Sequence, residues 1–142
     1  MKQQNFRNHS KWVIGYHLVT FLAIVDLITG SIRNLIVTEE VNLYPAVLLV
    51  IISFILLFMF YFLRSFALKA QDRAIRVEEN FRHYLLTGKS LSTGLTIRQI
   101  IGLRFASDDE FPALAEKAAQ ENLSENDIKK SIQNWKSDSY RV

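Results

Sequence analysis

The sequence predicts an all-α membrane protein: a two-helix transmembrane hairpin, a second helix that extends into the cytoplasm, and a small three-helix C-terminal bundle. Two apolar runs, 12–32 and 44–63, are each about 20 residues long, enough for a helix to cross ~30 Å of hydrocarbon. No glycine or proline interrupts residues 46–87, and helix-start patterns follow residue 95. Most of the charge lies after residue 64, which separates a membrane part from a soluble part.

The composition excludes several classes of function. The 142 residues contain no cysteine, so disulfides, thiolate metal sites and cysteine nucleophiles are excluded. The formal net charge of +3 is small and scattered, and it does not indicate a nucleic-acid partner. A chain of this length has room for a membrane element and one small soluble domain.

The first transmembrane helix is predicted over 12–36, after a cytoplasmic N-terminal tail of residues 1–11. A signal peptide is the alternative, because basic residues precede the apolar run and the small residues T-G-S follow it at 29–31. The second run favours the hairpin, since it contains no charge and needs a partner span of opposite direction.

The cations predict how the hairpin is oriented. They cluster before the first run and after the second, at Lys2, Arg7, Lys11, Arg64, Lys69, Arg73 and Arg76. The positive-inside rule then places both termini in the cytoplasm and the outer loop, 37–43, outside the cytoplasmic (inner) membrane. The last four cations are predicted to form a patch that faces anionic lipid headgroups.

The second helix is predicted over 44–86. Along 53–84 it has a seam with a spacing of three and four residues, typical of helices that pack in pairs. The seam consists of Ser53, Leu56, Phe60, Leu63, Ala67, Ala70, Ala74, Val77, Phe81 and Tyr84. Two interpretations remain open: the seam packs against the first span and the C-terminal helices, or it forms a parallel homodimer. Beside it, Glu78 and Arg82 are spaced as an ion pair.

A linker rich in glycine and serine, 87–95, leads to the cytoplasmic helical bundle, 96–142. Its helices are predicted to start at Thr96, Ser107 and Ser124, each with an acid or amide three residues later. The first two patterns predict full capping boxes, in which the two side chains satisfy backbone N–H groups reciprocally.

Each of these helices carries an apolar stripe, so the three are expected to pack together and against the long helix. The last stripe is Ile128, Ile132 and Trp135. Trp135, with Lys129 and Lys130, is a possible binding site for a protein partner.

Three patterns resemble known sites only in part. TGKS at 87–90 has the tail of a phosphate-binding loop, but its first glycine and the preceding strand are missing. The three histidines do not have a metal-ligand spacing, so no metal or other cofactor is predicted. Residues 113–135 resemble a helix-turn-helix, but Asn122 replaces the turn glycine and acids balance the lysines.

A carboxylate lies within the first apolar run, in the stretch FLAIVDLITG at 21–30. Folding the hairpin about residues 39 and 40 sets Asp26 level with Ser53, so the two are predicted to form an intramembrane polar pair. The pair is either a clamp between the helices or an ionisable site for transport or coupling.

Three stretches, FALKAQDRAIRVEE (66–79), LRFASDDEFPAL (103–114) and IKKSIQNWKSDSYRV (128–142), resemble an uncharacterised bacterial family of small two-span membrane proteins. The resemblance implies an architecture and a bacterial cytoplasmic membrane. It implies no activity and no catalytic residues.

The sequence therefore favours a non-enzymatic, membrane-anchored interaction or scaffold protein whose cytoplasmic bundle binds a protein partner. One alternative is a small transport or proton-coupled subunit that uses Asp26. Another is a membrane-tethered DNA-binding regulator built on residues 113–135, although nucleic acid is the less expected partner.

Overall fold

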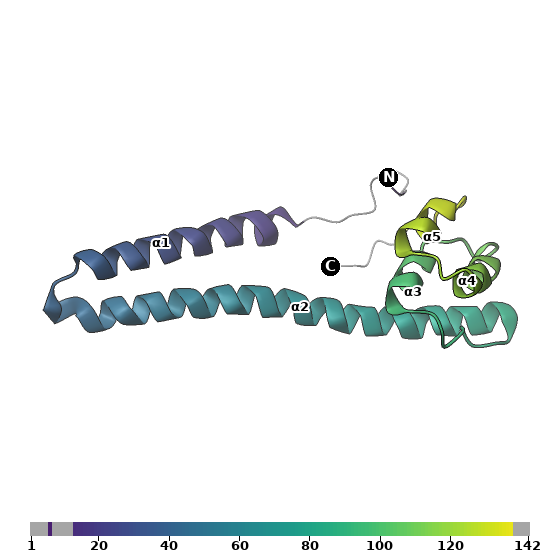
Figure 1. Ribbon diagram of the computed structural model, residues 1–142, viewed down its shortest axis with the longest axis horizontal. Helices are drawn as coiled ribbons and strands as arrows, with labels where there is room; N and C mark the ends of the chain where they lie inside the picture. The colour runs from purple at the N-terminus through teal and green to yellow at the C-terminus, as the bar shows by residue number, and fades with distance from the viewer. Residues whose placement is uncertain (1–5, 7–12, 138–142) are drawn as a thin grey trace. The chain divides into compact units, whose positions relative to one another are not determined.

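The computed structural model describes Phe6 and residues 13–137, and the predicted all-α fold is confirmed in this part of the chain (Figure 1). The described residues form two compact units, which divide between Ala67 and Leu68 within the longest helix. Residues 1–5, 7–12 and 138–142 lie outside the described residues. They include all of the predicted N-terminal tail except Phe6.

The first unit is a helical hairpin. A π-helical segment η1 (Gly15–Thr20) leads directly into α1 (Phe21–Val37). The hydroxyl of Thr20 donates to the Gly15 carbonyl, five residues back, at 3.0 Å. The wider winding of η1 was not predicted from the sequence, because apolar periodicity does not distinguish π from α turns at this length.

Five residues connect the two long helices. Thr38 and Glu39 are extended, and the 3₁₀ turn η2 (Glu40–Asn42) follows. The helix α2 (Leu43–Thr87) then runs for 45 residues, one residue beyond the predicted limits at each end. By length and composition, Gly15–Val37 and Glu40–Thr87 are each apolar enough to cross a membrane.

The hairpin packs through small side chains. On α1 the inward stripe includes Ile24 and Ser31, and on α2 it includes Ala46 and Ser53; these four side chains are buried. The Ser31 and Ser53 hydroxyls lie 3.3 Å apart. Three of these four residues, Ala46 and the two serines, are small, and small side chains let two helix backbones approach closely.

The second unit places three short helices on the C-terminal half of α2 (Figure 1). They are α3 (Ile97–Leu103), α4 (Phe111–Gln120) and α5 (Glu125–Ser131). Their shared core contains Leu103, Phe105, Phe111 and Ile128, all fully buried. From α2, Ile75 joins this core. The unit therefore depends on α2 for one wall of its core.

Helix caps hold α3 and α5 as predicted. The Thr96 hydroxyl accepts from the Gln99 N–H, and the Gln99 carboxamide oxygen accepts from the Thr96 N–H, which is a full capping box. Ser124 accepts from the Asp127 N–H at 3.2 Å. Gln99 also donates to the Leu123 carbonyl at 3.0 Å, so one buried side chain links α3 to the turn between α4 and α5.

The predicted capping box at Ser107 is wrong. Helix α4 begins three residues later than that pattern requires, at Phe111, because a turn occupies residues 108–110. The Ser107 hydroxyl is buried and has no hydrogen-bond partner among the described residues. The Glu110 carboxylate does accept from the Ser107 N–H at 3.4 Å.

The last helix is shorter than its apolar stripe predicts. α5 ends at Ser131, and the chain continues as an extended segment that pairs with residues 105–107. The Ser107 N–H donates to the Asn134 carbonyl at 3.0 Å, and the Lys136 N–H donates to the Phe105 carbonyl at 2.8 Å. Trp135 therefore reaches the core from an extended strand-like segment and not from a helix.

Candidate functional site

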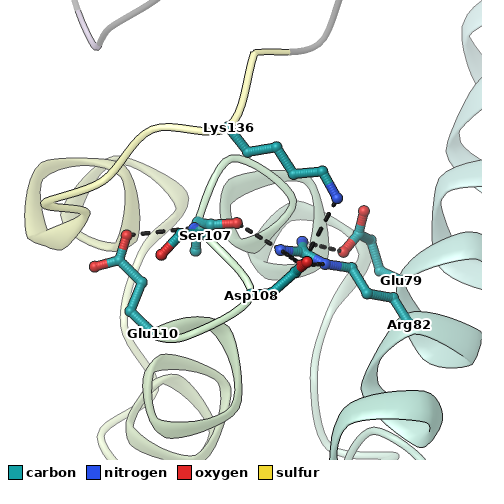
Figure 2. A network of polar contacts seen from close by, with 7 residues as sticks. Glu79, Arg82, Ser107, Asp108, Glu110 and Lys136 are labelled. Atoms are coloured by element: carbon teal, nitrogen blue, oxygen red, sulfur yellow. Dashed lines mark hydrogen bonds and ion pairs between the residues drawn. The ribbon is translucent and has the colours of Figure 1, made fainter.

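The Arg82 guanidinium is the centre of a polar network on the C-terminal half of α2 (Figure 2). Its Nε atom donates to Asp108 Oδ1 at 2.7 Å, and its Nη1 atom donates to Glu79 Oε2 at 3.0 Å. Nη2 donates to the Ala106 carbonyl at 2.7 Å. The guanidinium also lies 4.4 Å from the centre of the Phe111 ring, a cation–π contact.

Three parts of the unit supply this network. Glu79 and Arg82 lie one turn apart on α2, Asp108 lies in the loop between α3 and α4, and Lys136 lies on the extended C-terminal segment. Lys136 Nζ is 3.7 Å from the Asp108 carboxylate. Arg82 and Glu79 are only 12% exposed, so the network is a partly buried joint between α2 and the bundle.

The two carboxyls of the network differ in their pKa. Burial raises the pKa of Glu79, because the cost of desolvation exceeds the stabilisation from the Arg82 hydrogen bond and charge. The pKa of Asp108 is lowered, chiefly by the hydrogen bond from Arg82. Asp108 is 58% exposed, so water remains available to its carboxylate.

A groove of about 510 Å³ lies beside this network. From α2 it is lined by both apolar and charged side chains, and the loop before α4 and the C-terminal segment add further charged ones. The lining residues are Glu78, Glu79, Phe81, Arg82, Leu85, Leu86, Arg104, Asp108, Lys136 and Ser137. The groove contains both acids and bases, which suits a protein surface better than a single small anion or cation.

Two of the apolar lining residues, Phe81 and Leu85, also belong to an exposed face of α2. Val77, Phe81, Tyr84 and Leu85 are between 54% and 69% exposed. We call these four residues the apolar face of α2. A contiguous cluster of large exposed apolar side chains is typical of a surface that binds another molecule. The face and the groove together form the candidate site.

Among the described residues, no group of His, Asp and Glu is arranged to hold a metal ion. His83 has a local role, because its Nδ1 donates to the Lys89 carbonyl at 2.7 Å. Asn80 accepts from the Leu91 N–H at 2.9 Å. These two hydrogen bonds hold the linker, residues 87–95, against α2.

The signature of a family of unknown function, DUF6526, matches residues 1–142. The chain belongs to the DUF6526 family. This agrees with the resemblance to an uncharacterised family and, because the family has no described activity, assigns no site residues. No curated protein and no solved structure shows significant similarity to this family member.

The predicted pair of Asp26 and Ser53 is not formed. Ser53 contacts Ser31 instead, and Asp26 is exposed on α1. Asp26 lies five residues from Ser31, which is about 7.5 Å along the helix and roughly 140° around it. The connection through η2 shifts the register of the two helices from the predicted one. The predicted clamp between Asp26 and Ser53 is therefore wrong.

The predicted headgroup-facing patch lies entirely on α2. Lys69, Arg73 and Arg76 are exposed, and Arg64 is half-buried. Lipid contact of these cations stays a prediction. Arg76 is exposed and lies about 100° around α2 from the buried Ile75.

The three possible partner-binding residues have different environments. Lys129 is buried and its ammonium is 2.6 Å from the Glu125 carboxylate, so it serves an internal ion pair and is not a surface contact. Trp135 is half-buried with its ring 5.1 Å from that of Phe105. Lys130 is exposed. The internal role of Lys129 also removes one of the two lysines on which DNA binding by α5 depends.

Sequence reasoning missed Arg82 as the centre of the site. The spacing of Glu78 and Arg82 suggested an ion pair, but Arg82 binds Glu79 and Asp108 instead. The sequence offers only a partial signal for this network. The acids Asp108 and Glu110 precede α4, but no local pattern connects them to Arg82, which lies 26 residues before Asp108.

Proposed function

We propose that this protein is a non-enzymatic, membrane-anchored interaction protein, in which α1 and the first half of α2 anchor the chain and the second half of α2, with its bundle, binds a protein partner. Both termini lie in the cytoplasm in this proposal, in keeping with the cations that flank the two apolar runs. The two helices apolar enough to cross a membrane support the anchor.

The apolar face of α2 is the observation that carries this proposal. Val77 lies 14 residues beyond Leu63, the end of the second apolar run, which is about 21 Å along a helix. A helix that crosses the membrane near its normal would hold this face well outside the hydrocarbon. Exposed apolar side chains at such a position are stabilised by a protein surface.

The polar network supports a binding role and not a catalytic one. Its acids and bases are paired with one another, and Arg82 makes contacts to Glu79, Asp108 and Ala106 at once. Groups held in this way fix the position of the bundle on α2 and so keep the neighbouring groove open. A rigid, preformed surface binds its partner with a smaller entropic cost.

Photo-crosslinking in the native membrane tests the proposal. A photoreactive amino acid at Tyr84 should give a covalent adduct with protein, whereas the same group at Arg76, exposed on the same helix, should give none. Equal adducts from both positions, or none from Tyr84, would overturn the binding role. Reporter fusions at Val142 and in the 38–43 loop test the anchor: an outside C-terminus would contradict it.

A further inference from the structure

The cytoplasmic half of α2 carries five exposed residues at coiled-coil spacing. They are Ala70, Ala74, Val77, Phe81 and Tyr84, which we call the cytoplasmic seam. Val77, Phe81 and Tyr84 are 69%, 60% and 54% exposed. Steps of four and three residues keep these side chains on one line when two helices wind around each other.

The described part of the chain does not cover this seam. The bundle packs beside the seam, where Ile75 is buried and Glu79 and Arg82 make their ion pairs, and Phe81 borders the groove between the two. The linker is held to α2 by His83 and Asn80. In heptad terms, Ile75, Glu79 and Arg82 occupy outer positions, so a second helix on the seam leaves the bundle in place.

The charges beside the seam are complementary to a second copy in parallel orientation. With Ala74 and Phe81 at the first core position of each heptad, Arg73 falls at the flanking position g and Glu78 at e. In a parallel pair, each g residue meets the e residue five positions further on in the other helix. Arg73 therefore meets Glu78 of the partner subunit, and the two-fold axis repeats the contact.

The opposite orientation brings like charges together. In an antiparallel pair, g faces g and e faces e, which sets Arg73 against its own equivalent and Glu78 likewise. Both side chains are exposed, and neither has an ion pair within the described residues. The charge pattern thus selects the parallel arrangement, which is also the one that two copies inserted in the same membrane must adopt.

We propose that a second copy of this chain covers the cytoplasmic seam, forming a parallel dimer with reciprocal contacts between Arg73 and Glu78. This inference rests on the proposed function and names the partner of its binding face. The alanines at 70 and 74 bring the two helices close, and the larger side chains from Val77 onward supply most of the buried apolar area. Confinement of both copies to one membrane raises their effective concentration.

Cysteine cross-linking of the full chain in native membrane vesicles tests the dimer. The chain has no cysteine of its own, so each introduced thiol is unique. Under mild oxidation, Ala74→Cys and Val77→Cys should form disulfide-linked dimers roughly tenfold faster than Arg76→Cys, which is exposed on the same helix but off the seam. Equal rates at all three positions, or no dimer at the seam positions, would overturn the proposal.

Charge reversal tests the orientation. In the Ala74→Cys protein, Arg73→Glu or Glu78→Arg should lower the cross-linked fraction several-fold, and the two changes together should restore it. Loss without restoration contradicts the Arg73–Glu78 contact, provided that Trp135 fluorescence shows an intact bundle. A Tyr84 photo-adduct with another protein, but no cross-linked dimer, would refute the second copy and leave the interaction role standing.

Discussion

Arg82 on α2 and Asp108 in the loop before α4 are joined by a hydrogen bond of 2.7 Å, although 26 residues separate them in sequence. The same guanidinium also binds the Ala106 carbonyl and the Glu79 carboxylate, so one side chain of α2 holds groups from the loop before α4 and from its own helix. The docking of the bundle on α2 should depend strongly on it.

Replacing Arg82 with methionine should destabilise the second unit by roughly 2–4 kcal/mol. The change leaves the Ala106 carbonyl and the partly buried Glu79 carboxylate without their donor. Chemical unfolding of the full chain in detergent, followed by Trp135 fluorescence in a Trp12→Phe background, measures the loss. The matched control is Arg76→Met, on an exposed residue of the same helix, which should change stability by less than about 0.5 kcal/mol.

The opposite pKa shifts of Glu79 and Asp108 predict two pH effects of opposite sign. Glu79 has a folded pKa above its usual 4.5, so the native state binds more protons and stability falls as pH rises from 4.5 through the folded value. Asp108 has a folded pKa below its usual 3.8, so its stabilisation is present above 3.8 and is lost as pH falls through the folded value.

Two amide variants separate these effects. The melting temperature of Glu79→Gln, relative to the unaltered protein, should rise as pH increases from 4.5 through the folded pKa of Glu79, because the variant no longer loses stability as the carboxyl ionises. The Asp108→Asn variant should lose less stability than the unaltered protein as pH falls below 3.8. A Glu79→Gln difference that stays constant with pH would show that this carboxyl has an ordinary pKa in the folded chain.

Removal of the Ser107 hydroxyl should be neutral or slightly stabilising. The hydroxyl is buried without a hydrogen-bond partner among the described residues, so alanine removes an uncompensated polar group. Glu110→Ala should instead cost about 1–3 kcal/mol, since that carboxylate accepts from the Gln133 and Asn134 N–H groups at 3.1 and 3.0 Å. A loss of about 1 kcal/mol in Ser107→Ala would mean that the hydroxyl acts as a cap after all.

Gly102 should not tolerate a methyl group. A Cβ atom there would lie 3.1 Å from the Glu125 carbonyl oxygen and 3.2 Å from the Ile128 side chain, where α3 meets α5. Gly102→Ala should therefore destabilise the unit by roughly 1–3 kcal/mol in the same unfolding assay. Gly94→Ala is the control, because its added carbon meets only Ser92 at 3.6 Å.

The hairpin should respond to Ser53 and not to Asp26. Ser53→Leu places a large side chain where the α1 and α2 stripes meet, at a position that is 0% exposed, and should separate the two helices. Asp26→Asn changes an exposed side chain and should leave the packing intact. Spin labels attached to cysteines at the exposed positions Leu22 and Phe58 would report the separation. A larger response to Asp26→Asn would restore a structural role for that carboxylate.

The sequence predicted the features that depend on local patterns. The length of the apolar runs and the absence of glycine and proline in 46–87 predicted α1 and the long α2 closely. Gly88, at φ +71°, ends α2 in a conformation that suits glycine, as the start of the predicted linker requires. The caps at Thr96 and Ser124 depend on residues three apart and were also predictable.

Features that depend on distant contacts were not predictable. The Arg82 network joins residues 26 apart, and Glu110 reaches the backbone of residues 23 and 24 positions later. The pairing of Ser31 with Ser53 depends on the conformation of the five connecting residues, and an error of a few residues there moved the expected partner to Asp26. Helix α5 ends early because its continuation pairs with the loop after α3, which no periodicity reports.

The two serines of the hairpin have a consequence for how the chain enters a bilayer. Ser31 donates to the Ile28 carbonyl at 3.0 Å and Ser53 to the Val50 carbonyl at 2.7 Å, each within its own helix. Each hydroxyl thus has an acceptor before the helices meet, and a lone helix exposes no unsatisfied hydroxyl proton to lipid. In the anchored protein proposed here, insertion of either helix can precede their association, and the later contact between hydroxyls fixes the register without being needed for entry.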